Sequence, residues 1–412
     1  MPANPIAAAA ATPAIQGADT AWMLVSTVLV FLMTMPGLML FYSGMLRKRN
    51  ALSIMAQTIA SIGVVTVLWA ALGYTLAFDV GNGWWGGLSK AWASGLVGPL
   101  SQAHVLAPTV PESVFFLFQM GFAIVAFALV LGATAERMRI GVAMVFAAGW
   151  LLLVYAPVAH WVWHPTGWLA SMGHMDFAGG TVVHIAAGAS GLAAAVACGA
   201  RRGFGKEPMA PHNLTLTVLG AGLLWAGWFG FNAGSAFEAG TRAAGALLVT
   251  QVAAGAGALA WGFAEMLRRQ QMSVLGMATG AIAGLIAITP ASGFVGVSGG
   301  LAIGVLGSLA CFGAVSYFKA LTGIDDSLDV FALHGVGGLV GTVLTPVFAL
   351  PSIAPVTATP LVNLVGALAV LVYAAAASYV LLKCIQFVVG LRVTAKQESV
   401  GLDLAQHGES AT

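Results

Sequence analysis

The sequence contains very little charge. Only 7% of its 412 residues are Asp, Glu, Lys or Arg, whereas 59% are apolar. A soluble globular domain is usually about one quarter charged, so this composition excludes an ordinary soluble protein. Glycine is abundant, with 53 residues and no collagen-like repeat. Because small residues let membrane helices approach closely, the composition predicts a helical protein that crosses the bilayer many times.

Cysteine pairs and the motifs of soluble enzymes are missing. Cys198, Cys311 and Cys384 lie far apart in apolar runs, without a CxxC pair or a Cys/His cluster, which argues against a disulfide framework or a zinc site. The chain has no HExxH, no phosphate-binding loop and no nucleophile elbow. We therefore expect no enzymatic activity, no cofactor, no metal and no nucleic-acid partner.

Long apolar runs dominate the rest of the chain. A membrane helix needs about 20 mainly apolar residues. Eleven runs meet this requirement, and they cover residues 21–45, 52–78, 113–135, 141–163, 177–199, 214–233, 243–266, 274–290, 294–318, 329–349 and 361–390. The eighth run is the shortest, and the last is long enough to continue beyond the bilayer. These runs predict an all-α integral membrane protein with eleven transmembrane helices.

The distribution of cations predicts the orientation. If the N-terminus lies outside, the cytoplasmic segments contain 14 of the 16 Lys and Arg residues, and only Lys90 and Arg242 lie outside. An even number of spans would break this alternation. We expect an external tail at residues 1–20, a membrane domain at 21–390 and a cytoplasmic tail at 391–412. No cation precedes the first alanine run, so a secretory signal is not predicted.

A His-x3-Gly-x2-Gly pattern occurs twice. It begins at His184 in the fifth run and again at His334 in the tenth. Each occurrence is therefore in the fifth helix of a five-helix half. Because five is odd, the two halves enter the membrane from opposite sides, which is typical of an inverted repeat with a site near the midplane.

The two histidines are the strongest candidates for a functional role. An imidazole in hydrocarbon needs a hydrogen-bond partner, and intramembrane ionisable residues commonly mark pores or proton relays. A structural histidine that bonds to a neighbouring backbone is the alternative. Counting about 1.5 Å per residue from the span ends places His184 and His334 on opposite sides of the midplane, so their direct contact is not predicted.

Polar and aromatic groups near the predicted outer surface allow two interpretations each. Asp176 can cap the fifth helix or attract a cation. Trp163 can anchor the membrane interface or present its ring face to a cation. The aromatic and glycine residues at 225–235 fit ordinary packing, but they also suit a constriction.

Other polar residues lie in the loops, in the tail or at the start of the tenth run. We expect five histidines to be solvated: His104, His164, His174, His212 and His407. We expect Asp325, Asp326 and Asp329, at the start of the tenth helix, to be solvated or to cap it.

Several segments together resemble the Amt/Mep/Rh ammonium transporter family. The matching segments are MPGLMLFYSG (35–44), GATAERMRIG (132–141), DFAGGTVVHI (176–185), GFGKE (203–207), PHNL (211–214), GWFGFNAGSA (227–236), GAIAGLIAITPASG (280–293) and DVFALHG (329–335). They extend along nearly the whole chain. The resemblance implies an eleven-helix protomer with inverted five-helix halves and one pore, assembled as a homotrimer.

The resemblance also implies a site. Trp163, Ser235 and Phe122 would form the outer ammonium site, and Phe122 and Phe231 would form a ring gate below it. These residues match the bacterial Amt branch rather than the Rh proteins. Asp176 would organise the outer site.

Further roles follow from the same resemblance. His184 and His334 would line the pore and relay a proton. The tail resembles the family's regulatory C-terminus, which in bacterial relatives couples the subunits. The cytosolic face of those relatives docks a PII signal protein, and the resemblance implies an inner-membrane location.

The predicted mechanism rests on the chemistry of ammonium. Potassium has a similar size, but ammonium has four N–H donors and a proton that it can release. A serine hydroxyl can accept one N–H bond, aromatic faces can stabilise the charge, and a dry pore favours neutral ammonia. Two alternatives are an electroneutral ammonia channel and an ammonium sensor that signals through its tail.

Overall fold

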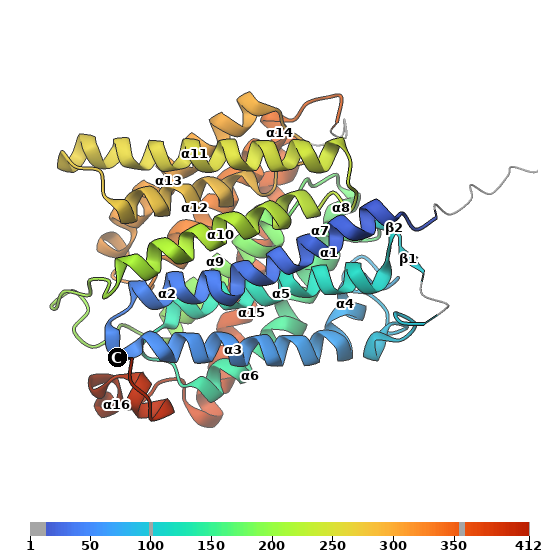
Figure 1. Cartoon of the computed structure of the whole chain (residues 1–412). Coiled ribbons are helices and arrows are strands. Elements are labelled where there is room, and N and C mark those ends of the chain that lie inside the picture. Colours follow the sequence, from blue (N-terminus) through green and yellow to red (C-terminus); the bar gives the residue numbers. More distant parts are fainter. Residues whose placement is uncertain (1–13, 99–101, 354–358, 412) are drawn as a thin grey trace, which may run out of the picture.

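The protein is a bundle of long helices, most of which lie with their axes roughly parallel to one another (Figure 1). The computed structural model describes residues 14–98, 102–353 and 359–411. Within these residues, 10 helical segments are long and apolar enough to cross a membrane: Gly17–Met45, Lys48–Phe78, Glu112–Thr134, Ile140–Ser171, Gly180–Cys198, Leu214–Gly234, Thr241–Arg269, Val297–Thr322, Phe331–Phe348 and Pro360–Val389. Each of them corresponds to one run predicted from the sequence.

The eighth predicted run forms a short helix, α12 (Val274–Ile288), of 15 residues. At about 1.5 Å per residue, it is shorter than a hydrocarbon core of about 30 Å. It packs against α11 and α13, and the irregular residues 289–295 that follow are all buried. Non-helical backbone is tolerated at membrane depth where protein covers it. Within the part of the chain that the structure describes, the membrane fold thus has ten full-length spans and one short apolar helix.

Several spans contain wide, π-helical turns that divide them into shorter helices. The α-helices are α1 (Gly17–Leu32), α2 (Met39–Met45), α3 (Ala51–Leu68), α4 (Tyr74–Phe78), α5 (Glu112–Thr134), α6 (Ile140–Trp150), α7 (Ala156–Trp163), α8 (Trp168–Ser171), α9 (Ala186–Cys198), α10 (Leu214–Gly234), α11 (Thr241–Arg269), α13 (Val297–Thr322), α14 (Val336–Phe348), α15 (Pro360–Val389) and α16 (Ala395–Val400). The wide turns are Met33–Leu38, Trp69–Gly73, Leu151–Tyr155, Gly180–Ile185 and Phe331–Gly335. Two of these turns contain the candidate histidines.

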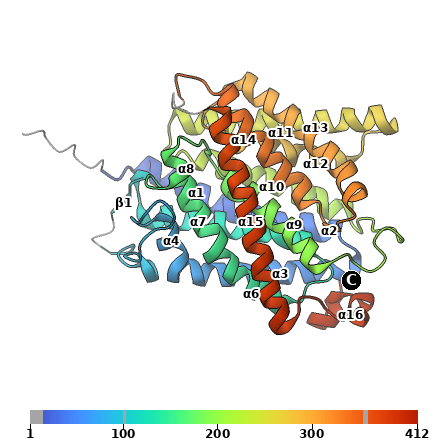
Figure 2. The same cartoon turned by 180° about the vertical axis from the view of Figure 1, so that it is seen from behind.

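The last span, α15, holds the bundle together from one side. Figure 2 shows it running obliquely across the back of the molecule. It packs against α9 and α6 of the first half and α14 of the second. Helix α1 begins at one end of the bundle, and α16 lies at the opposite end (Figure 1).

The N-terminal boundary of the membrane domain differs from the expected one. Helix α1 begins at Gly17, so the end of the predicted 1–20 tail is helical, and residues 1–13 lie outside the described residues. In the outer loop, β1 (Ala103–His104) pairs antiparallel with β2 (Ala107–Pro111).

Three histidines that we expected to be solvated are buried. His104 and His174 are each 7% exposed, and His164 is 3% exposed. His104 stacks on the ring of Phe115 at 4.4 Å, and His174 lies 3.0 Å from the Thr181 hydroxyl. Burial lowers the pKa of His174 to about 4. The prediction was wrong because loop residues fold back over the helix ends.

A buried ion network ties loops together at the end of the bundle opposite the start of α1. The Glu136 carboxylate pairs with Arg47 at 2.6 Å and with Arg201 at 3.2 Å, and Arg201 pairs with Asp325 at 2.7 Å. Burial raises the pKa of both carboxyls, but their bonds to arginine outweigh burial and hold each pKa below its ordinary value. The expectation that Asp325 is solvated or a helix cap was therefore wrong.

The C-terminal segment packs on the same end of the bundle. The Glu398 carboxylate accepts bonds from the Arg202 backbone N–H at 2.6 Å and from Arg392 at 2.8 Å. Asp403 accepts the backbone N–H of Leu52 and of Ser53 at the start of α3. The tail is thus an ordered segment whose carboxylates cap and brace the membrane helices.

Candidate functional site

A small cavity, named the outer cavity after its predicted position, lies at the end of the bundle near the turn between β1 and β2. Its volume is about 80 Å³, and its lining consists of Leu106, Gln119, Phe122, Trp163, Phe177, Ser235 and Phe237. Three of the residues predicted for an outer site, Trp163, Ser235 and Phe122, are thus brought together from α7, the end of α10 and α5.

Hydrogen bonds orient the two polar groups of this cavity. The indole N–H of Trp163 donates to the Asp176 carbonyl at 2.9 Å, so the indole has no N–H left for a ligand and offers its ring. The Ser235 hydroxyl donates to the Phe231 carbonyl at 2.9 Å. A hydroxyl has one proton and two lone pairs, so Ser235 remains an acceptor toward the cavity.

Asp176 is a helix cap. Its two carboxylate oxygens accept four backbone N–H bonds at 2.7–3.1 Å, from Gly179, Gly180, Thr181 and Val182. Gly179 has φ 108°, a left-handed conformation that glycine adopts without strain. Burial raises the pKa of this carboxyl, while the four donors stabilise its ionised form. Asp176 does not line the cavity, so this geometry favours the capping interpretation.

Two stacked phenylalanine rings separate the outer cavity from the centre of the bundle. Phe122 and Phe231 are parallel within 7°, with their ring centroids 4.0 Å apart. Phe122 lines the outer cavity, whereas Phe231 lines the next one. Trp163 meets Phe122 edge to face at 5.9 Å. The stacked pair therefore lies between the two cavities.

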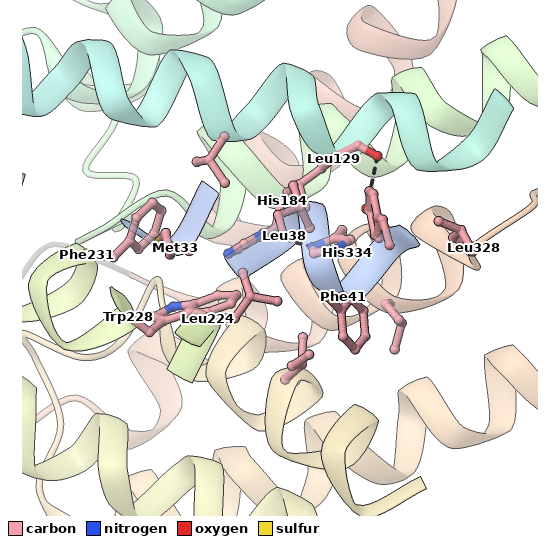
Figure 3. A pocket seen from close by; sticks show the side chains of 14 residues that line it. Met33, Leu38, Phe41, Leu129, His184, Leu224, Trp228, Phe231, Leu328 and His334 are labelled. Atoms are coloured by element: carbon pink, nitrogen blue, oxygen red, sulfur yellow. Dashed lines mark hydrogen bonds between the residues drawn. The ribbon is translucent and has the colours of Figure 1, made fainter. Parts of the chain in front are cut away.

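His184 and His334 contact each other beyond the rings. Their Nδ1 atoms are 3.1 Å apart, and their ring planes lie within 22° of each other. Figure 3 shows both imidazoles in the same narrow space, with Trp228 and Leu224 alongside. The Nε2 atom of His184 is buried and has no hydrogen-bond partner among the described residues. Each imidazole thus keeps one ring nitrogen for a ligand.

Their contact corrects the estimate that placed them on opposite sides of the midplane. Both histidines lie in π-helical turns, Gly180–Ile185 and Phe331–Gly335, rather than in regular α-helix. The glycine four residues after each histidine touches the other half. A Cβ added at Gly188 would lie 3.1 Å from the His334 carbonyl carbon, and one at Gly338 would lie 3.1 Å from the His184 Cβ. The repeated glycines let the two backbones approach until the rings meet.

The space around the histidines is narrow and apolar. A cavity of only about 10 Å³ is lined by the two histidines, Trp228, Phe231, Tyr42 and nine apolar residues. The Tyr42 hydroxyl donates to the Leu129 carbonyl at 3.2 Å, and the Trp228 indole donates to Thr289 at 2.9 Å. Because these two polar groups are already paired, the lining offers a ligand chiefly the imidazole nitrogens.

A larger, polar cavity of about 320 Å³ follows at the opposite end. It shares Leu328 and Leu333 with the histidine cavity and includes Glu265 and Asp329 in its lining. Asp329 lies 3.0 Å from Lys319. Burial raises the pKa of Asp329 to about 6, although Lys319 opposes this effect. The three cavities, the ring pair and the histidines are thus arranged in series across the bundle.

Comparison with known proteins identifies the family. A sequence model described as the Ammonium Transporter Family matches residues 21–412. An ammonium transporter of Bacillus subtilis is 43% identical over 405 residues, covering 96% of this chain and 98% of its own. This chain belongs to the ammonium transporter family. A putative ammonium transporter of Methanothermobacter thermautotrophicus is 42% identical, with 95% and 97% of the two chains covered.

Solved structures agree with this assignment. The crystal structure of Mep2 from Saccharomyces cerevisiae matches with a TM-score of 0.86 and 35% identity, covering 93% of this ammonium transporter and 89% of that chain. A structure described as a sensor Amt protein matches with a TM-score of 0.87 and 28% identity, covering 95% and 98%. The membrane fold predicted from the sequence is confirmed, and the chain is a multi-pass transporter.

Sequence reasoning missed three features of this transporter's site. Gln119 lines the outer cavity, although its place between two phenylalanines had suggested no role. Trp228, for which packing and a constriction were both open, stacks on His184 at 5.4 Å and 22°, a contact that the sequence did not predict. The pairing of Arg201 with Asp325 joins residues 124 positions apart, which no local pattern reveals.

Proposed function

We propose that this ammonium transporter recruits NH4⁺ at the outer cavity and conducts it past His184 and His334 as NH3 with a relayed proton. The observation that carries the proposal is the serial order of the groups. A cavity with an acceptor and aromatic faces comes first, stacked rings follow, and facing imidazoles in an apolar space come last.

The outer cavity suits ammonium because it combines a hydrogen-bond acceptor with aromatic ring faces. Ser235 provides lone pairs, and the faces of Trp163 and Phe122 provide cation–π attraction of about 0.5–2 kcal/mol each. Potassium can use the same attraction, but it cannot release a proton to become neutral. The apolar space beyond the rings then excludes a cation that must keep its charge.

The contact between the histidines supports a proton relay. A hydrogen bond between two Nδ1 atoms requires one ring to carry its proton on Nδ1 and the other on Nε2. One free Nε2 is then an acceptor and the other a donor, so the pair can bind ammonia and ammonium in turn. When ammonium donates a proton to the free acceptor Nε2, the shared Nδ1 proton can move to the partner ring, which then releases its own Nε2 proton on the far side. These three transfers interchange the donor and acceptor roles and would carry one charge across the dry segment, while neutral NH3 passes.

The membrane arrangement is part of the same proposal. We place the protein in the inner membrane with residues 1–20 outside, the transport domain at 21–390 and a cytoplasmic regulatory tail at 391–412. The excess of Lys and Arg on the tail side supports this orientation. The outer cavity then faces the source of ammonium.

We also propose a homotrimer, and one polar group on the surface supports contact between protomers. Gln251 is exposed on α11, about 15 Å from the start of the helix and thus near mid-membrane. Its carbonyl accepts a bond from the Trp225 indole at 3.0 Å, and its amide N–H groups have no partner among the described residues. An exposed amide in lipid is unfavourable, so contact with another protomer at α10 and α11 would explain it.

Sensing is the second candidate function. The sensor Amt protein among the similar structures and the ordered tail, braced through Glu398 and Asp403, favour it. A PII-type signal protein would dock on the same cytosolic face. Binding of that partner that depends on ammonium, with no measurable ammonium flux, would support sensing over transport.

Ammonium and potassium jumps on proteoliposomes test the proposal. We expect a saturable current with ammonium and none with potassium or in protein-free liposomes. His184→Ala combined with His334→Ala should abolish the current or its selectivity against potassium. An ammonia-dependent rise in internal pH without current would replace the proposal with an electroneutral ammonia channel, and unchanged selective current in the double variant would exclude the histidines.

A further inference from the structure

The outer cavity contains a polar side chain that the proposed recruitment site does not use. Gln119 lines the cavity and is only 4% exposed. Its carbonyl oxygen is buried, and no partner for it exists among the described residues. Burying an unpaired amide costs free energy, and most buried amides in proteins are therefore hydrogen-bonded.

The position of Gln119 is set by a regular helix. Gln119 precedes Phe122 by three residues on α5, so both side chains lie on the same helix face. Phe122 is the ring that meets Trp163 and stacks on Phe231. The amide is thus held beside the aromatic wall and on the same cavity as Ser235.

The other polar groups of the cavity determine what Gln119 can bind. The Trp163 N–H and the Ser235 hydroxyl proton are both donated to backbone carbonyls. Toward the cavity these two residues present only lone pairs and π-electrons. A neutral ligand with acceptors would find no donor from them, whereas a cation with only N–H donors fits both.

We propose that Gln119 is a cargo-binding residue whose amide carbonyl accepts an N–H bond from ammonium in the outer cavity, opposite the acceptor of Ser235. This inference rests on the proposed transport function. Rotation of the terminal amide by 180° brings either its carbonyl or its NH2 to the cavity, and ammonium selects the carbonyl. Two acceptors hold two of the four N–H groups, and the ring faces stabilise the remaining charge.

The concentration dependence of the ammonium current in proteoliposomes tests this inference. Gln119→Leu has a similar volume and no acceptor. We expect its half-saturating ammonium concentration to rise by about tenfold or more, as for loss of a hydrogen bond to a charged group. Gln119→Asn withdraws the carbonyl by one CH2 and should give a smaller rise. If the leucine variant does not yield stable protein, the asparagine variant carries the test.

A matched control separates binding from packing. Gln57 on α3 is also a buried amide, 1% exposed, with its carbonyl oxygen unpaired among the described residues, and it is not part of the outer cavity lining. Gln57→Leu should leave the half-saturating concentration unchanged. An equal rise in both leucine variants would overturn the inference, because it would reflect a general effect of removing buried amides.

The preference for ammonium over methylammonium separates a binding role of Gln119 from a purely structural one, because a structural role would leave this preference unchanged. Methylammonium has one N–H donor fewer than ammonium, and its methyl group cannot bond to a carbonyl. The preference for ammonium over methylammonium should therefore fall by several-fold in Gln119→Leu. An unchanged preference and half-saturating concentration would exclude Gln119 while leaving the transport proposal intact. Absence of a saturable ammonium current in the unmodified protein would refute both the transport proposal and the binding role of Gln119.

Discussion

Replacing Gly188 with alanine tests whether backbone contact between the two halves positions His184 and His334. A Cβ on Gly188 would lie 2.5 Å from the Gly335 Cα and 3.1 Å from the His334 carbonyl carbon. Carbon atoms in contact are normally about 3.5–4.0 Å apart, so the two segments must separate by about 1 Å. Because the Nδ1 atoms are already 3.1 Å apart, this shift would break their hydrogen bond.

The expected stability change combines two opposing effects. Overpacking in a rigid core costs about 3 kcal/mol at its usual upper end, whereas alanine in a helix is favoured over glycine by about 1 kcal/mol. Gly188→Ala should therefore lower the free energy of unfolding by about 2 kcal/mol. It should also strongly reduce the ammonium current.

Gly63 provides the matched control for this substitution. It lies inside α3, and a Cβ added there meets no atom within 4 Å. Gly63→Ala should stabilise the protein by up to about 1 kcal/mol and leave transport unchanged. Thermal unfolding in detergent and proteoliposome currents would measure both variants. Equal stability and equal current in Gly188→Ala and Gly63→Ala would refute the proposed role of the close contact.

Three further predictions concern charged groups. Glu136→Gln should destabilise the protein by about 3 kcal/mol, measured by thermal unfolding, because it leaves Arg47 without its buried counter-charge and Arg201 with Asp325 alone; a loss below 1 kcal/mol would contradict this. Asp329 has a folded pKa of about 6 against an ordinary 3.8, so the folded state binds more protons between these values. Stability should fall by up to about 3 kcal/mol as pH rises through this window, and Asp329→Asn should flatten this part of the profile; a variant that retains the full slope would exclude Asp329 as its source. Asp176→Asn should lower stability by about 2 kcal/mol or more and reduce transport, because an NH2 group would face backbone N–H donors; normal unfolding and normal current would show that the cap is dispensable.

The fold was predictable because membrane helices follow local composition. Hydrocarbon requires about 20 apolar residues for each span and internal pairing of the backbone, so each run in the sequence became a helix at nearly the expected place. The short eighth run was predictable as the weakest, and it became α12 of 15 residues. The prediction for Asp176 as a cap also succeeded, because a cap depends on residues immediately after it.

Parts of the site were predictable only by resemblance. The pattern at His184 and His334 was visible in the sequence, but their contact was not, because regular helix geometry does not anticipate two π-helical turns. Solvation was predicted wrongly for His104 and Asp325 because their partners are distant in sequence. Loop residues without local periodicity carry no signal of what folds over them.

The sequence by itself determined that the chain is a helical membrane protein, how many membrane segments it has and on which side Lys and Arg are in excess. These properties depend on the free energy of transferring each residue between water and lipid. Only the tertiary structure decided which side chains meet. It stacked Phe122 on Phe231, set the imidazoles 3.1 Å apart and left the amide of Gln119 buried beside Ser235. Those arrangements depend on how closely the two halves approach, and this is set by the packing of glycines against distant backbone rather than by any local pattern.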